Sequence, residues 1–205
     1  MEEEKGIRPY KIGVISTHGT GKTTLVAGLV NSFRKRHFTA KEIAEIATEF
    51  LEAGYPINEE TKLSAQYAIL NTQMSEEQKK FLRGKYEIII TDRTVYDNLQ
   101  YLERACGKHD WIRDMVLNYA REFPYDAIYR LPLVGTLKEN GIRSTDYEFQ
   151  IDIHNRLTTF LDEYKIKHKI LPEPKDPKIE HRDEWIDLIV NDTLEDLRKR
   201  GHYGG

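Results

Sequence analysis

The sequence predicts an α/β fold in which a five-stranded parallel sheet is flanked by helices. Two observations favour this fold class. Short apolar runs alternate along the 205 residues with longer stretches whose apolar residues recur at helical spacing. One run, Ile88-Ile89-Ile90, has no polar alternation, which is typical of a parallel strand buried on both faces. Strands and helices in alternation are the pattern of a parallel sheet covered by helices.

Five apolar runs are expected to form the strands. The first begins at Tyr10 and ends at a loop that contains two glycines, and the third contains the isoleucine run. Pro132 closes the fourth, because proline cannot donate to a strand ladder, and Pro172 follows the fifth. In chain order, the predicted strands are 10–15, 37–42, 86–91, 125–131 and 165–171.

Amphipathic stretches between these runs are expected to form the helices. The longest has Asn58 as its predicted N-terminal cap and Gly84 at its end, residue types that favour those positions. Another begins at Thr145, which forms a capping-box pattern with Glu148. In chain order, and including caps, the predicted helices are 22–35, 43–52, 58–84, 95–105, 111–122, 145–164 and 182–199.

Length and composition indicate a single domain over residues 1–205. The net charge of −3 gives no electrostatic case for a nucleic-acid partner, although a local basic patch stays open as an alternative. Cys106 is the only cysteine, which excludes an intrachain disulfide and fits a reducing compartment. The acidic start and the lack of a long apolar run predict a cytoplasmic protein without a membrane segment. The sequence is compatible with a homodimer.

The segment 16–24, Ser-Thr-His-Gly-Thr-Gly-Lys-Thr-Thr, lies between the first predicted strand and the first predicted helix. This order predicts a phosphate-binding P-loop and hence a P-loop NTPase fold, although Ser16 stands where the usual pattern has glycine. Lys22 can reach the β- and γ-phosphates, and the Thr23 hydroxyl suits a Mg²⁺ ligand. The predicted nucleotide-binding residues are His18, Gly19, Thr20, Gly21, Lys22, Thr23 and Thr24.

Asp92 and Arg93 follow the third predicted strand. An acidic residue after such a strand is typical of a Walker B position, so Asp92 is a candidate Mg²⁺ ligand, with a helix cap as the alternative. Many water-activating ATPases carry a second acid at the next position. Arg93 places a guanidinium there, which suits an anionic acceptor or a transferring phosphoryl group.

Two further segments carry candidate catalytic residues. Glu42 and Glu45 follow the second predicted strand, and a carboxylate there can orient or deprotonate an acceptor hydroxyl. Glu42 is the preferred candidate because it is nearer the strand end, and a solvated helix face is the alternative. Lys138 and Arg143 flank an Asn-Gly turn in the segment 134–146, which reads either as a cationic lid over a triphosphate or as an ordinary charged loop.

Taken together, these motifs resemble P-loop kinases of the nucleoside and nucleotide kinase type. Within that group the chain is similar to the small AAA-type ATP-binding domains related to ribosylnicotinamide kinase. The resemblance spans roughly residues 10–165, and its Asp-Arg block is shared with thymidylate-kinase-like enzymes. The family often has serine at position 19 and arginine at position 45, where this chain has Gly19 and Glu45. The matching blocks are 17–25, 55–60 with 65–66, 91–98 and 139–146.

The resemblance implies ATP and Mg²⁺ as cofactors, a lid that includes Arg143, and an adenine site near 172–175. The leading hypothesis is phosphoryl transfer from ATP to a small nucleoside- or nucleotide-like acceptor. Lys22 and Arg143 would stabilise the transferred group, Arg93 would position the acceptor, and Glu42 or Glu45 would orient its nucleophile. A nucleotide switch or ATPase without a metabolite acceptor, and a polynucleotide end kinase, are the alternatives. The chain has no Asn-Lys-x-Asp motif, which favours adenine over guanine.

Overall fold

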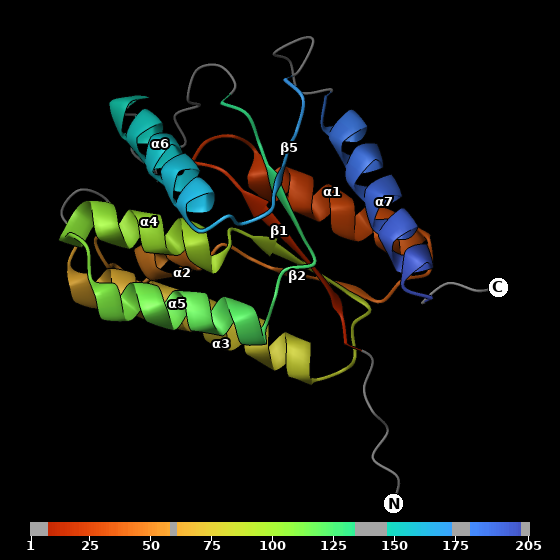
Figure 1. Ribbon diagram of the computed structural model, residues 1–205, viewed down its shortest axis with the longest axis horizontal. Helices are drawn as coiled ribbons and strands as arrows, with labels where there is room; N and C mark the ends of the chain where they lie inside the picture. The colour runs from red at the N-terminus through yellow and green to blue at the C-terminus, as the bar shows by residue number, and fades with distance from the viewer. Residues whose placement is uncertain (1–7, 58–60, 134–146, 174–180, 202–205) are drawn as a thin grey trace, which may run out of the picture.

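The computed structural model describes residues 8–57, 61–133, 147–173 and 181–201. A five-stranded sheet forms the middle layer, and helices cover both of its faces (Figure 1). The strands are β1 (Tyr10–Ile15), β2 (Ala40–Ile43), β3 (Ile88–Asp92), β4 (Ala127–Arg130) and β5 (Lys169–Ile170). The helices are α1 (Lys22–Lys35), α2 (Ile46–Glu52), α3 (Leu63–Leu82), α4 (Val95–Cys106), α5 (Asp110–Glu122), α6 (Tyr147–Glu163) and α7 (His181–Lys199).

The strand order is β2-β3-β1-β4-β5, and every neighbouring pair is parallel. Strand β1 therefore lies at the centre, with β3 on one side and β4 on the other. Val14 pairs with Asp92 and Ile15 pairs with Arg130, so the carboxyl ends of these three strands lie together. This arrangement confirms the predicted fold class and places the loop after β1 between two other strand ends.

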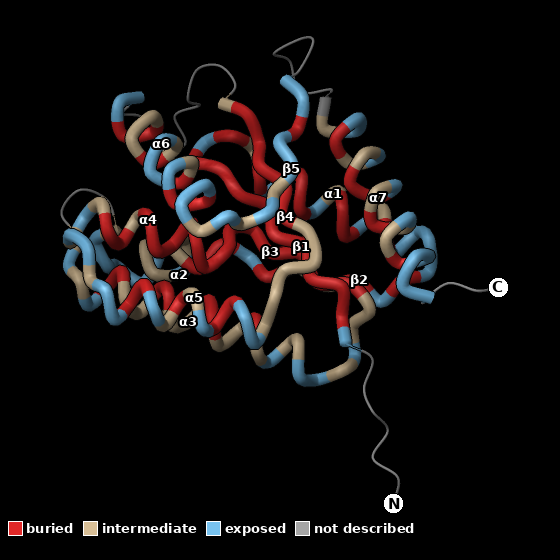
Figure 2. The backbone as a smooth tube through the Cα atoms, in the orientation of Figure 1, coloured by how far each residue is buried: buried red, intermediate tan, exposed pale blue. Residues whose placement is uncertain are grey.

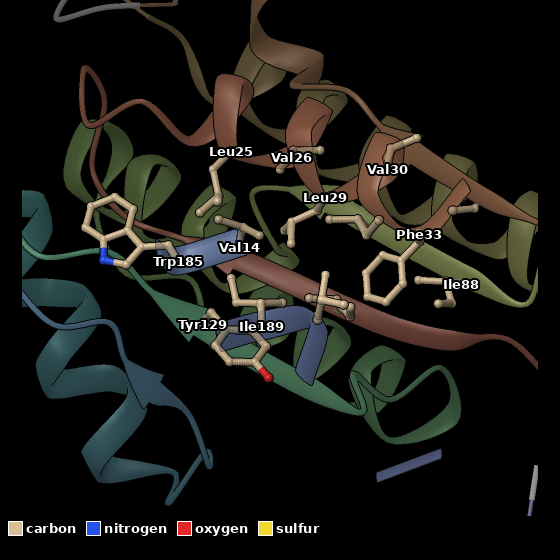
Figure 3. Packing of buried hydrophobic residues seen from close by; sticks show 14 of the residues in the cluster. Val14, Leu25, Val26, Leu29, Val30, Phe33, Ile88, Tyr129, Trp185 and Ile189 are labelled. Atoms are coloured by element: carbon tan, nitrogen blue, oxygen red, sulfur yellow. The ribbon is translucent and has the colours of Figure 1, made fainter. Parts of the chain in front are cut away.

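Two hydrophobic clusters fill the spaces on either side of the sheet. On one side, α1 and α7 pack over β1 and β4, as Figure 3 shows for Leu25, Leu29, Trp185, Ile189 and Tyr129. On the other side, apolar residues of α3, α4, α5 and α6 pack against the opposite face. Strand β1 is buried along its whole length, and the tube in Figure 2 shows the central strands as largely buried. Burial on both faces explains the near-continuous apolar runs.

Several predicted boundaries are confirmed and others are wrong. The first strand and first helix have the predicted bounds. Helix α3 begins at Leu63 with Lys62 as its N-cap, so the predicted start at Asn58 is wrong; position 58 itself lies outside the described residues. The side chain of Gln66 donates to Thr61 Oγ1 and to the Ile57 carbonyl, so helix α3 is hydrogen-bonded to these two residues that precede it.

The second and fifth strands also differ from prediction. The predicted 37–42 strand begins only at Ala40, because His37 adopts a left-handed backbone with φ of 67° after helix α1. The strand then continues through Ile43, so the following helix starts at Ile46 rather than at 43. The fifth strand has two residues, since Lys165 and Ile166 instead bond back to the end of α6. Among the described residues, no helix is long and apolar enough to cross a membrane.

Candidate functional site

The loop after β1 turns sharply into α1 at two glycines. Gly19 and Gly21 have φ values of 74° and 86°, a left-handed conformation that a side chain at Cβ disfavours. Gly21 is the N-cap of α1, and no side-chain hydrogen bond caps this helix. Its first backbone N–H groups therefore keep their donor capacity at the positive end of the helix dipole, where Thr23 and Thr24 are exposed. This geometry suits a phosphate.

Lys22 is folded over the same loop. Its side chain is almost fully buried, and Nζ donates a 2.5 Å hydrogen bond to the Thr17 carbonyl. Burial, together with the positive charge of Arg93, lowers the pKa of Lys22 to about 8, while Asp92 and Glu45 oppose this shift. A desolvated ammonium whose hydrogen bond goes to a neutral carbonyl gains strongly from a nearby anion.

Thr23 and Asp92 join α1 to the end of β3. The Thr23 hydroxyl donates to Asp92 Oδ2 at 2.5 Å, while Asp92 Oδ1 is buried and has no hydrogen-bond partner among the described residues. Burial raises the pKa of the Asp92 carboxyl. A hydroxyl beside a carboxylate with one unused oxygen matches the hard oxygen ligands of Mg²⁺.

The alternative role of Asp92 as a helix cap does not fit the structure. Helix α4 is capped by Thr94, whose hydroxyl accepts from the Tyr96 backbone N–H. Asp97 completes the capping box, because its Oδ2 accepts from the backbone and the hydroxyl of Thr94. Asp92 is therefore left for another partner. Within the described part of the chain no group of three or more His, Cys, Asp or Glu residues forms a metal cage.

Arg93 is held in a strained and buried position. Its φ of 82° is rare for a residue with a side chain, and such strain clusters at functional sites. Its Nε and Nη2 both lie 2.7 Å from Glu45 Oε1, and its guanidinium lies 4.3 Å from the centre of the Tyr101 ring. Burial disfavours the charged guanidinium, but Glu45 and other nearby acceptors outweigh it and raise the pKa of Arg93. Arg93 therefore stays cationic beside the phosphate loop.

The structure brings Glu45, rather than the preferred Glu42, to this group. Glu42 is the third residue of β2, where it pairs with Ile90 and is half-buried. Within the described residues its side chain makes no hydrogen bond or ion pair. Glu45 lies two residues beyond the strand, at the N-cap of α2, and is buried against Arg93. The prediction placed Glu42 at the strand end, whereas the strand runs on to Ile43.

Sequence reasoning missed an aromatic cluster around His18. The His18 ring lies 5.3 Å from the Phe149 ring, and its Nδ1 is 3.3 Å from the Tyr101 hydroxyl. Gln150 Nε2 donates to the His18 carbonyl at 2.9 Å, and Arg104 Cζ lies 3.8 Å from the centre of the Phe149 ring. The loop is thus braced against both α4 and α6.

One signal for this cluster is present in the sequence. Asp97, Tyr101 and Arg104 recur at helical spacing on one face of α4, directly after the Asp-Arg pair. Their partners on α6 are distant in sequence. The predicted lid, with Lys138 and Arg143, lies outside the described residues, so its role stays a prediction.

A sequence profile of a family described as an AAA domain matches residues 11–182. The chain belongs to this AAA domain family. The match covers the phosphate loop, the Asp92-Arg93 pair and the start of α7. A sequence search against curated proteins finds no significant match.

Solved structures show the fold of this AAA domain. A structure of the NadR protein in complex with NR superimposes with a TM-score of 0.74 at 20% identity, over 89% of this chain and 51% of that one. NadR in complex with NAD and AMP-PNP gives 0.71 at 19% identity, over 89% and 49%. Thymidylate kinase from Ehrlichia chaffeensis gives 0.63 at 15% identity, over 92% and 100%. The chain spans about half the length of the NadR chains, and its fold is that of P-loop nucleotide kinases.

Proposed function

We propose that this AAA domain is a kinase that transfers a phosphoryl group from ATP, with Mg²⁺, to a small nucleoside- or nucleotide-like acceptor. The observation that carries the proposal is the buried pair at the end of β3. Asp92 offers an unused carboxylate oxygen next to Thr23, and Arg93 offers a fixed guanidinium next to Glu45. A site for hydrolysis alone does not require this second, cationic half.

The donor half would consist of the phosphate loop and the metal ligands. Backbone N–H groups of the loop and of the first turn of α1 would surround the phosphates, and Lys22 would neutralise them. Thr23 and Asp92 would hold Mg²⁺, which would neutralise negative charge on the donor phosphates. The orphaned oxygen of Asp92 supports this ligand set.

The acceptor half would lie on the Arg93 side. Glu45 holds the guanidinium through a buried ion pair, so Arg93 presents a fixed orientation to an anionic or hydroxyl-bearing acceptor. Glu45, as the carboxylate in contact with Arg93, is the better candidate to orient the nucleophile than Glu42. Arg143 would add positive charge from the lid segment. Phosphoryl transfer depends mainly on positioning and charge, which this set of residues can supply.

The known ligands of similar proteins support the choice of acceptor class. One NadR structure contains NR and another contains NAD and AMP-PNP, and a third similar protein is a thymidylate kinase. We infer for this chain an acceptor of the same general class, with ATP as donor. The proposed reaction requires no membrane partner.

Label transfer from γ-³²P-ATP tests the proposal. The protein is incubated with Mg²⁺ and, separately, with nucleosides that include NR, with nucleoside monophosphates, with a short 5′-hydroxyl oligonucleotide, and with no acceptor. The expected result is label on one mononucleoside or mononucleotide, and its loss in Asp92→Asn. Label found only in inorganic phosphate would favour the ATPase or switch, and label on the oligonucleotide would favour the end kinase.

A further inference from the structure

Arg182, in the first turn of α7, reaches the phosphate loop from the far end of the sequence. Its guanidinium lies against Gly21: Nη2, Nε and Cζ are 2.8, 3.2 and 3.3 Å from the point that a Cβ on Gly21 would occupy. Only a residue without a side chain allows this approach. Gly21 is the residue before Lys22 and the N-cap of α1, so the guanidinium sits at the entrance to the predicted phosphate site.

The packing of α7 on α1 places Arg182 there. A Cβ on Gly28 would lie 2.4 Å from Ile186 Cδ1, so the two helices also touch closely about two turns further along α1 and about one turn further along α7. Gly21 precedes Gly28 by about 10 Å of helix and Arg182 precedes Ile186 by about 6 Å, distances that the long arginine side chain closes. Trp185 anchors the same turn, because it is buried and its Nε1 donates to the Pro172 carbonyl at 3.0 Å.

The electrostatic surroundings of Arg182 call for an anion. A cation in the first turn of a helix opposes the helix dipole, and the N-terminal end of α1, with Gly21 as its N-cap, adds positive potential beside the guanidinium. Asp183 and Glu184 follow in sequence, but both side chains are exposed. Within the described part of the chain, Arg182 makes no ion pair with a carboxylate. The guanidinium is half-buried, so water screens this repulsion only in part.

We propose that Arg182 binds the phosphate chain of the donor nucleotide, a contact made from α7 in addition to the loop and Lys22. The inference rests on the proposed donor site, whose buried and unpaired Asp92 Oδ1 independently points to a charged ligand. A guanidinium can give two parallel hydrogen bonds to phosphate oxygens, so lysine at this position would replace the charge but not the fork. Arg182 would thus be a binding residue for the donor.

Isothermal titration of wild type, Arg182→Gln and Arg182→Lys tests this contact, with Mg²⁺-ATP, Mg²⁺-tripolyphosphate and adenosine as separate probes. Arg198→Gln, at the exposed far end of α7, is the matched control, and thermal unfolding of each variant verifies folding. Arg182→Gln is expected to weaken ATP and tripolyphosphate binding alike by roughly 10- to 100-fold, to leave adenosine unchanged, and Arg182→Lys to fall between. Arg198→Gln should bind as wild type does.

The outcomes separate this inference from the proposed function. Equal affinity of Arg182→Gln and wild type for tripolyphosphate would overturn the inference, as would a loss confined to ATP and adenosine, which would indicate base stacking. Arg182-dependent binding of ATP and tripolyphosphate without label transfer to any acceptor would support the inference and reject the kinase. A wild-type protein that binds neither ATP nor tripolyphosphate would overturn both.

Discussion

One buried ion pair lies near the amino ends of the strands and another near their carboxyl ends. The two regions differ in how fully their polar atoms are hydrogen-bonded within the protein. Near the amino end of β1, Lys11 and Glu77 are both fully buried and lie 2.8 Å apart. Glu77 also accepts hydrogen bonds from Gln73, Tyr119 and Tyr125, at 2.8, 3.0 and 2.7 Å. Lys11 additionally donates to the Phe123 carbonyl. Both oxygens of Glu77 therefore have protein partners.

The pair at the carboxyl ends of the strands is built differently. Arg93 and Glu45 are also buried and in contact, but Arg93 has a left-handed backbone and its neighbour Asp92 has an unpaired oxygen. A strained backbone at Arg93 next to an unpaired carboxylate oxygen at Asp92 costs stability, and this combination is typical of a site that a ligand completes. We infer that the Lys11–Glu77 pair is structural and that the Asp92–Arg93 group serves binding.

Gln73 connects the two regions. Its Nε2 donates to Glu77 Oε1 at 2.8 Å and also lies 3.3 Å from the Arg93 carbonyl. The structural network thus helps to hold the strained backbone at the candidate site. A substitution in either region can therefore affect the other through Gln73.

The largest expected effect is on the free energy of unfolding, at the Lys11–Glu77 pair. Glu77→Gln removes the counter-charge of a fully buried lysine, and breaking a buried pair in this way costs about 3–5 kcal/mol. Urea unfolding measures the loss. The double variant Lys11→Met/Glu77→Met should recover part of it, because no uncompensated charge remains. A change of less than about 1 kcal/mol in Glu77→Gln would contradict a structural role.

The next largest expected effect is on kcat, at Asp92 with its unpaired oxygen. Asp92→Asn keeps an acceptor for the Thr23 hydroxyl but removes the anionic ligand, so kcat should fall about 100- to 1,000-fold. Urea unfolding should show a stability close to that of wild type, since a neutral amide costs less to bury than a charged carboxylate with an unpaired oxygen. Loss of stability to the same extent as in Glu77→Gln would instead make Asp92 a structural residue.

Two matched glutamates test which carboxylate belongs to the site. Glu45→Gln leaves Arg93 without its ion pair and should reduce kcat about tenfold or more, with a rise in KM for the acceptor. Glu42→Gln should remain within about twofold of wild type, because Glu42 lies inside β2 and away from these contacts. The reverse order of effects would restore Glu42 as the residue that acts on the acceptor.

Gln73→Met probes the connection between the two regions. The variant keeps the side-chain volume but removes hydrogen bonds to Glu77 and to the Arg93 carbonyl, at an expected cost of about 1 kcal/mol. If the link matters, unfolding free energy and kcat fall together. A loss of stability with wild-type kcat would show that the two regions are independent.

The smallest effect concerns Arg130, a buried arginine at the end of β4. Its Nη2 lies 2.9 Å from His154 Nε2, and burial together with the charge of Arg130 lowers the pKa of His154. The unfolded chain therefore takes up the proton more readily, so this contribution is fully present above about pH 6.5 and is lost as the pH falls below that value through the lowered pKa of the folded state. His154→Gln should flatten this part of the stability–pH profile, measured by urea unfolding from pH 5 to 8. An unchanged slope would exclude His154 as the cause.

The sequence predicted the parts of this molecule that depend on local order. Strand β1, helix α1, the phosphate loop and the Asp92-Arg93 pair each combine a residue pattern with a position next to a strand end. The choice of Glu42 over Glu45 depended on where the second strand ends. An apolar pattern does not fix a strand boundary to within one or two residues. Helical spacing places Tyr101 on one face of α4, but its contact with His18, and the contacts of the loop with α6 and with Arg182 of α7, join residues far apart in sequence and could not be predicted.

Transfer of the γ-phosphoryl label from ATP tests the central claim most directly, in wild type, Asp92→Asn and Glu77→Gln at a temperature where all three are folded. The account predicts Mg²⁺-dependent label on a mononucleoside or mononucleotide with wild type, a loss of at least about 100-fold in Asp92→Asn, and transfer by folded Glu77→Gln much closer to wild type. Label released only as inorganic phosphate, or equal transfer by Asp92→Asn and wild type, would contradict it.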